Sequence, residues 1–384
     1  MGTGLQNFTS FWNTTNVRVL TPADQIHNEI CAQDYSLSWF LRGKKNTEVI
    51  QNGSKIKDFV LLEDQATAVS YLPNETFSWS SPQNTLSYEA DWRYVMDHSS
   101  TNEQEIEFQT GSGQDGVKVA FKKLAKIKRQ STLTSMLNKL EAQLWSAPMS
   151  LQSSYEGATG AREPYSIPCF VNEESGYLPY GWTSTIMGLN PTTYSKWRNV
   201  KNQYSYTDWN DVAGQQVGLF DIFTKTIKQI QFKKPPSVGP DGSPTSEGGS
   251  ECVIFTDLPG AMLVEKANRE NNSQFQGNGT DAYRGDAMFA NWKVIYVPQL
   301  DNAALYNNGS NTYVAQSSAQ YPGPRFYFIN TEYLRPFWHT NAYFKKLPSI
   351  IPPNQPESSV MPMRCWWNLF CRSRSRQAIV YPGA

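Results

Sequence analysis

One long amphipathic segment, residues 115–145, constrains the fold more than any other part of the sequence. Its apolar residues recur at steps of three, four and six along one face of an α-helix, at Val117, Phe121, Leu124, Ile127, Leu133, Leu137, Leu140 and Leu144. Pro148 is expected to end the helix. A continuous helix of this length spans about 45 Å, well over twice the average. We therefore expect a single spine helix in a chain that otherwise consists of strands and loops.

The region before this helix, residues 56–108, switches to a period of two. Within 84–96 the even positions are apolar and the odd positions are mostly polar; the apolar set is Leu86, Tyr88, Ala90, Trp92, Tyr94 and Met96. This alternation predicts one half-buried strand with a single apolar face. Partner strands are expected at 56–63, 67–72 and 105–109. Few residues of the chain remain to cover this face, which favours packing on another chain.

After the spine helix the sequence predicts a mixture of helices and strands. Helical patterns occupy 211–230 and 258–271, and residues 233–249, rich in Pro and Gly, are expected to form an exposed loop. Apolar or aromatic strands are expected at 252–256, 293–297, 326–330, 335–339 and 364–370. The fold class predicted from the whole chain is α+β.

Composition and motifs argue against an enzyme. The formal net charge is zero, with 34 basic and 34 acidic residues, so the net charge gives no indication of an oppositely charged partner such as a nucleic acid. The three histidines are isolated, the five cysteines form no CxxC or Cys/His cluster, and no GxSxG, HExxH, Walker A or GxGxxG motif occurs. No signal peptide and no run of 18 apolar residues is present. We expect reduced thiols, no catalytic residue, no metal, no cofactor and no membrane contact.

Two basic clusters remain. One follows the first half of the spine helix and consists of Lys118, Lys122, Lys123, Lys126, Lys128 and Arg129. Such a run is usually a solvated face, but six bases without an acid also fit sequence-independent phosphate contact. The other cluster, Arg372, Arg374 and Arg376, is expected on one face of a strand. Phosphate contacts and salt bridges between chains fit this second cluster equally well.

Six phrases in the sequence are distinctive: LNKLEAQLWSAP (137–148), GLNPTTYSKWRN (188–199), TDLPGAMLVEKANREN (256–271), FANWKVIYVPQLD (289–301), FYFINTEYL (326–334) and WNLFCRSRSRQAIVY (367–381). Together they resemble the major capsid proteins of tailed bacteriophages, which have the HK97-like fold. The phrases follow in order over most of the chain, from about residue 120 to residue 381. The first 110 residues resemble this family in pattern more than in wording.

The resemblance implies five segments. They are an N-terminal arm (1–50), an extended β-rich loop (51–112), the spine helix of a peripheral domain (113–149), an axial domain (150–325), and a returning sheet of the peripheral domain with the C-terminus (326–384). The arm and the loop would contact neighbouring subunits through aromatic residues, for which the candidates are Phe8, Phe11, Trp12, Trp79, Tyr88 and Trp92. The basic face of the spine helix would face the genome.

The function implied is that of a non-enzymatic coat protein, assembled in the host cytoplasm and found in the virion. The expected partners are copies of itself in hexamers and pentamers, a separate scaffolding protein, a portal protein, a cement protein and packaged double-stranded DNA. Two alternatives stay open. One is a secreted or particle-bound carbohydrate-binding or hydrolytic β-rich protein, which would need a pair of clustered carboxylates. The other is a nanocompartment shell protein of the same fold.

Overall fold

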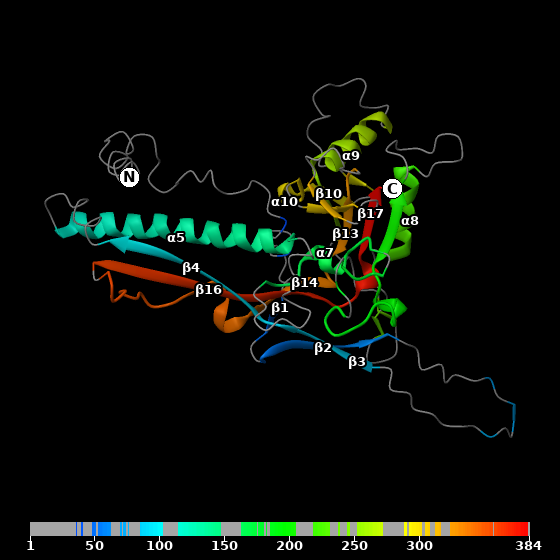
Figure 1. Ribbon diagram of the computed structural model, residues 1–384, viewed down its shortest axis with the longest axis horizontal. Helices are drawn as coiled ribbons and strands as arrows, with labels where there is room; N and C mark the ends of the chain where they lie inside the picture. Colours follow the sequence, from blue (N-terminus) through cyan, green and yellow to red (C-terminus); the bar gives the residue numbers. More distant parts are fainter. Residues whose placement is uncertain are drawn as a thin grey trace. The chain divides into compact units, whose positions relative to one another are not determined.

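The computed structural model describes part of the 384-residue chain (Figure 1). The described residues are 36, 40, 48–50, 53–62, 70, 72–73, 76, 85–102, 114–146, 163–174, 176–179, 182, 185–204, 218–230, 237–238, 244–245, 252–271, 288–289, 292–301, 304–307, 312–315, 323–355 and 357–382. Contacts divide the chain into two compact units, Met1–Gln33 with His98–Asn138 and Pro348–Pro362, and Asp34–Asp97 with Lys139–Leu347 and Met363–Ala384. Within the described part, no helix is long and apolar enough to span a membrane.

The smaller unit contains most of the predicted spine helix. Helix α5 runs without interruption from Gln114 to Leu144, which confirms this prediction (Figure 1). The same unit holds the end of strand β4 (Arg93–Asn102) and the start of strand β16 (Ser358–Cys371). Thr101 Oγ1 donates a hydrogen bond of 3.3 Å to the Ser359 carbonyl. A bridge between Ile350 and Val360, with two backbone hydrogen bonds of 2.8 Å, continues the strand structure.

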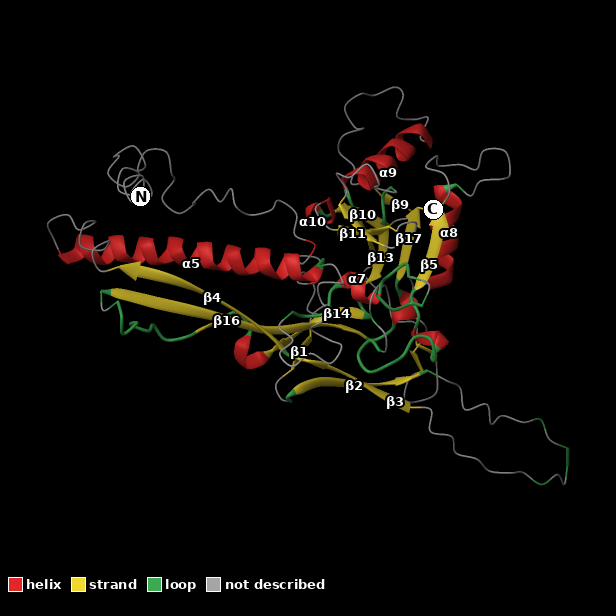
Figure 2. Cartoon of the chain, in the orientation of Figure 1, coloured by secondary structure: helices red, strands yellow, loops and turns green. Residues whose placement is uncertain are grey.

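The larger unit has a six-stranded sheet in the order β5-β17-β13-β8-β10-β9 (Figure 2). The strands are β5 (Val200–Tyr204), β8 (Cys252–Thr256), β9 (Met288–Phe289), β10 (Trp292–Tyr296), β13 (Phe326–Asn330) and β17 (Ala378–Pro382). Two helices belong to the same unit, α8 (Leu219–Ile230) and α9 (Leu258–Asn271).

The two central strands, β8 and β13, are buried at every residue. Phe223 of α8 packs edge-to-face on Phe326 and Phe328 on one side. On the other side Trp145, just after α5, packs on Phe255 and Tyr327. Because both faces are covered, the sequence needs the continuous apolar runs CVIFT and FYFIN instead of alternation.

A second, five-stranded sheet follows the order β1-β14-β16-β15, and β4 pairs with β16. Its further strands are β1 (Glu48–Ile50), β14 (Leu334–His339) and β15 (Lys345–Lys346). On one face Trp338 stacks on Trp367, whose indole Nε1 donates to Gln143 of α5. On the other face Phe337 and Phe370 are in ring contact. A two-stranded hairpin, β2 (Lys55–Leu61) and β3 (Thr85–Asp91), covers part of that face, because its Tyr88 stacks on Phe370.

The single strand predicted at 84–96 is wrong in one respect. The structure interrupts it at Trp92, between β3 and β4, and the burial changes phase there. Tyr88 and Trp92 are buried as predicted, but Arg93 is buried next, and the apolar Tyr94 and Met96 are 64% and 68% exposed. The physical reason is a change of partner, since β3 pairs with β2 and β4 pairs with β16.

The remaining predicted elements lie near their expected positions, and strands 252–256 and 326–330 and helix 258–271 have the predicted bounds. Helix α8 begins later than predicted, and strands 67–72 and 105–109 lie largely outside the described residues. The predicted loop 233–249 contains one short strand pair. The short elements are α7 (Ile167–Phe170), η1 (Ser195–Trp197), β6 (Ser237–Val238), β7 (Pro244–Thr245), α10 (Pro298–Asp301), β11 (Ala304–Asn307), β12 (Thr312–Ala315), η3 (Thr340–Ala342) and η4 (Arg374–Arg376).

The five-segment division of the chain stays a prediction. The sheet topology shows how the last two segments, 150–325 and 326–384, are connected by strand pairing. Strands β13 and β17, from the segment expected to form the returning sheet, pair with β8 and β5 of the segment expected to be the axial domain. Strands β14 and β16 of the same segment form the five-stranded sheet. The C-terminal segment is therefore shared between two sheets.

Candidate functional site

The basic cluster of the spine helix lies on α5 as expected. The helix includes Lys118, Lys122, Lys123 and Lys126, but their side chains lie outside the described part of the structure. Lys128 Nζ donates a 2.7 Å hydrogen bond to the Ser100 carbonyl, which fastens the helix to β4 within the smaller unit. Arg129 is exposed. Phosphate contact by this cluster stays a prediction.

The second predicted cluster does not form one face of a strand. Arg374 and Arg376 lie in the short helix η4, and Arg372 precedes it. Arg374 is fully buried and is not available to phosphate or to another chain. Its guanidinium donates four hydrogen bonds of 2.8–3.1 Å, to the carbonyls of Phe170, Trp197 and Tyr177 and to Asn199 Oδ1. Burial lowers the pKa of Arg374 to about 10.

Arg374 is therefore a structural residue that ties distant loops to the turn between β16 and β17. The spacing of the three arginines predicts a common role, but the structure separates them. Arg372 Nε donates to Asp58 Oδ2 at 3.2 Å, and its guanidinium lies 5.7 Å from the centre of the Phe337 ring. Arg376 is partly exposed. For these two residues, contact with phosphate or with another chain stays a prediction.

The predicted aromatic contacts between subunits divide in the same way. Tyr88 and Trp92 are 2% and 3% exposed, so both are part of this chain's own core and the prediction is wrong for them. Tyr88 lies between Trp197 and Phe370, and the Trp92 indole donates to the Gly53 carbonyl at 3.0 Å. The other four candidates, Phe8, Phe11, Trp12 and Trp79, lie outside the described residues.

An exposed apolar surface on the β2–β3 hairpin was missed by the sequence reasoning. Phe59 and Leu61 of β2 are 66% and 68% exposed, opposite Ser87 and Thr85 of β3. We call this pair, Phe59 and Leu61, the hairpin patch. The signal was available, because in KIKDFVL these two residues alternate in phase with Lys55 and Lys57 and out of phase with the buried Ile56.

The base of the same hairpin face is charged instead of apolar. Lys55 Nζ lies 2.5 Å from Glu89 Oε1 and 3.7 Å from Asp91 Oδ1. The hydrogen bond from Lys55 holds the pKa of Glu89 below its ordinary value, and the hydrogen bond to Glu89 raises the pKa of Lys55. The outward face therefore changes along its length from charged pairs to exposed apolar side chains.

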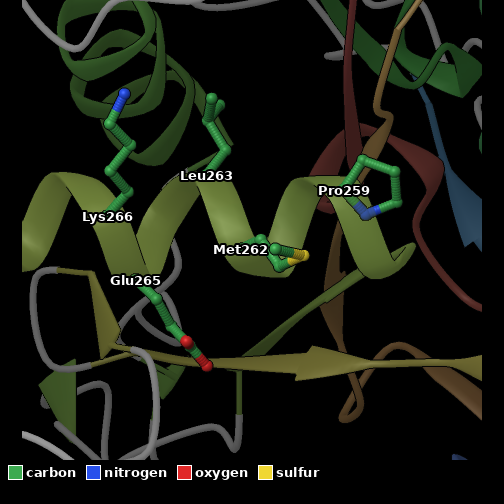
Figure 3. Close-up of a pocket in the computed structure, with 5 residues that line it drawn as sticks. All are labelled: Pro259, Met262, Leu263, Glu265 and Lys266. Atoms are coloured by element: carbon green, nitrogen blue, oxygen red, sulfur yellow. The ribbon is translucent and has the colours of Figure 1, made fainter.

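A shallow hollow of about 510 Å³ lies along helix α9 and is lined by Pro259, Met262, Leu263, Glu265 and Lys266 (Figure 3). Glu265 points to the opposite side of the helix from Leu263 and Lys266. A ligand pocket normally has a few polar groups that converge on one point. The lining of this hollow comes from a single helix and has no such arrangement.

The described residues contain no group of three or more His, Cys, Asp or Glu side chains that could hold a metal ion. Cys169, Cys252, Cys365 and Cys371 are free and buried. Burial raises the pKa of Cys169 to about 11 and those of Cys365 and Cys371 to about 12. These four thiols therefore pack as small apolar side chains.

Two solved structures resemble the chain over nearly its whole length. A chain of the capsid asymmetric unit of cyanophage A-1(L) is 12% identical with a TM-score of 0.54, and the match covers 94% of this chain and 98% of that chain. A chain of the mature capsid of bacteriophage PhiM1 is 11% identical with a TM-score of 0.50, and the match covers 97% and 96%. No protein-family model matches the sequence, and no curated protein matches it.

These comparisons identify the fold of the chain. The chain has the α+β HK97-like fold of phage capsid subunits, as the sequence resemblance implied. The long helix α5 and the two sheets are the parts of that fold described above.

Proposed function

We propose that this chain is the major capsid protein of a tailed bacteriophage. It is a non-enzymatic subunit that self-assembles into the icosahedral shell around a double-stranded DNA genome. The observation that carries the proposal is the likeness to two phage capsid subunits over more than nine-tenths of each chain. Because the matches cover 94% and 97% of this chain, the likeness is not confined to a single motif.

The hairpin patch supports self-assembly. Large apolar side chains that are two-thirds exposed on a two-stranded hairpin lose favourable burial unless another surface covers them. A subunit that repeats many times in a shell supplies such a surface on its neighbour. Weak contacts of this kind suffice, because each subunit makes several of them at once.

The partners that go with this function are copies of the chain in hexamers and pentamers, a separate scaffolding protein, a portal protein, a cement protein and the packaged DNA. The shell is assembled in the host cytoplasm and becomes the capsid of the virion. The scaffolding protein matters for the test, because the chain alone can give misassembled sheets or tubes.

The experiment is negative-stain microscopy with sizing chromatography of the purified chain, alone and with a scaffolding protein. We expect closed shells, or capsomer rings with sheets and tubes. The double variant Phe59→Ser/Leu61→Ser should remain folded, because both side chains are exposed, but should assemble at least several-fold less. The matched control Ser87→Ala/Thr85→Val changes the facing strand and should assemble normally.

A monomer under every condition would contradict the proposal and favour the carbohydrate-binding alternative, which a sugar-binding screen then tests. Shells that form in cells with protein cargo and no DNA would favour a nanocompartment. Normal assembly of the Phe59→Ser/Leu61→Ser variant would remove the hairpin patch from the argument and leave the fold as its support.

A further inference from the structure

Two residues from the N-terminal part of the chain are buried against the C-terminal end of the spine helix. Ser36 and Phe40 are 1% and 0% exposed. Both residues are helical, and a spacing of four positions places two side chains on one face of a helix. We call Ser36 and Phe40 the strap, because their contacts join the N-terminal part of the chain to α5 and to β8.

The polar side of the strap is a directed series of hydrogen bonds. The Trp145 indole Nε1 donates to Ser36 Oγ at 2.7 Å, and Ser36 Oγ donates to Glu141 Oε1 at 2.5 Å. The backbone N–H of Ser36 donates to the same carboxylate oxygen at 3.1 Å. Glu141 and Trp145 are 1% and 2% exposed, so water does not compete for these bonds. One hydroxyl therefore takes part in two of the three bonds that join the strap to the helix end.

The apolar side of the strap lies on the six-stranded sheet. The Phe40 ring stacks on Phe255 of β8, with ring centres 6.2 Å apart and an angle of 24° between the planes. Trp145 packs edge-on against the same Phe255 ring at 5.5 Å. The strap, the helix end and β8 thus share one buried cluster. A movement of the strap changes the surroundings of the helix end as well.

The strap is fastened by fewer contacts than the strands it covers. Among the described residues, three hydrogen bonds and one ring contact hold it, whereas β8 and β13 are buried at every residue. The gain from so few contacts is of the same order as the conformational entropy lost when a short segment becomes ordered. Segments of this kind open at a lower free energy than core strands do.

We propose that the strap is a conformational device, which opens locally in the free subunit and closes over the end of the spine helix when subunits assemble. The expected N-terminal arm precedes the strap directly, and contacts place Met1–Gln33 in the smaller unit and the strap in the larger one. A neighbour that holds the arm reduces the freedom that the chain gains on opening, so assembly favours the closed strap. This inference deepens the proposed function, on which it rests.

The first test uses the wild-type chain and measures hydrogen–deuterium exchange by mass spectrometry on free subunits and on assembled shells. In free subunits, peptides from 34–40 should exchange about tenfold faster than peptides from β8 and β13. In shells, the same peptides should exchange about tenfold more slowly than in free subunits, because the closed strap protects their amides. Exchange of 34–40 in free subunits at the rate of β8 and β13 would overturn the proposal.

The second test measures the coupling between the strap and the spine helix. Ser36→Ala removes two of the three hydrogen bonds, so we expect exchange to become about tenfold faster in 34–40 and in 139–145 together. Strand β14 should keep its rate. The matched control Ser166→Ala removes the hydroxyl of another fully buried serine of the larger unit, which contacts Cys169 Sγ at 3.2 Å. The control should leave exchange in both segments unchanged.

The remaining outcomes separate this inference from the proposed function. Faster exchange in 34–40 without any change in 139–145 would overturn the coupling to the spine helix, and equal acceleration of all strands would show general destabilisation instead of a local device. Equal exchange of 34–40 in free subunits and in shells would overturn the link to assembly. Failure of the wild type to assemble would refute the proposed function, whereas exchange in the free subunit would still test local opening.

Discussion

Arg374 and Arg364 lie ten positions apart near the C-terminus, yet their surroundings are opposite. Arg374 is fully buried, and its guanidinium meets four oxygen acceptors. The Arg364 guanidinium carbon lies 5.0 Å from the centre of the Trp366 ring, its Nε is buried without a hydrogen-bond partner among the described residues, and the residue is opposite Lys345. The first arginine has an acceptor for each of four hydrogen bonds, whereas the second is held by an aromatic ring. We therefore expect Arg374 to stabilise the subunit much more than Arg364 does.

The largest expected effect comes from removing the buried arginine. Arg374→Met deletes four hydrogen bonds and leaves buried acceptors without this donor, so we expect a loss of about 3–5 kcal/mol in the free energy of unfolding. Arg364→Met should cost less than about 0.5 kcal/mol, as for most surface substitutions. Urea unfolding of both variants measures the difference. Equal losses of unfolding free energy in the two variants would contradict the proposed difference between Arg374 and Arg364.

A smaller effect on the free energy of unfolding is expected when the pH is raised, because of the buried thiols near Arg374. Burial raises the pKa of Cys169 to about 11 and that of Cys371 to about 12, although the nearby Arg374 acts in the opposite direction. An unfolded thiol ionises near 8.5, so the unfolded state loses protons first as the pH rises. Stability is therefore fully present below about pH 8.5 and falls above it, by roughly 1–2 kcal/mol for each thiol at pH 10.

Unfolding at pH 7.5, 9 and 10 measures this fall, and Cys371→Ala should reduce it. Thiol reagents at pH 8 should label Cys169 and Cys371 only as fast as the chain unfolds. Rapid labelling of either residue in the native state would show that the region around Arg374 is more open than the structure has it.

The smallest effect is expected for a cation that has a partner but remains in water. Lys55 and Glu89 form an exposed ion pair on the hairpin, with side chains 48% and 43% exposed. Glu89→Gln should change the free energy of unfolding by about 0.2–1 kcal/mol, and high salt should remove most of the difference. A loss above 2 kcal/mol would contradict our proposal that an exposed cation contributes less to the free energy of unfolding than a buried one.

Much of the fold was predictable from local pattern. The spine helix follows from its 3.6-residue period, and β8 and β13 follow from unbroken apolar runs. These signals are reliable because a long helix or a strand covered on both faces needs nearly every residue to conform. The strand at 84–96 was predicted with one error, since its alternation continues through Trp92 while the strand changes partner there.

The candidate sites were less predictable than the fold. The hairpin patch could have been found from the phase of Phe59 and Leu61 relative to Ile56. The pairing of Lys345 with Arg364 could not be predicted, because the two residues become neighbours only through the β15–β16 register. Tyr88 and Trp92 were assigned to the subunit surface because the sequence shows an apolar face but not what covers it.

The sequence by itself determined the element types, the buried central strands and, through its resemblance, the fold. Tertiary structure alone decided which charges are structural. The arginines at 372, 374 and 376 look equivalent in the sequence, but the acceptors of Arg374 come from positions between 170 and 199, up to 204 residues away. Spacing along a chain fixes which side chains share a face, whereas the cost of burying a charge depends on acceptors that only the folded chain brings together.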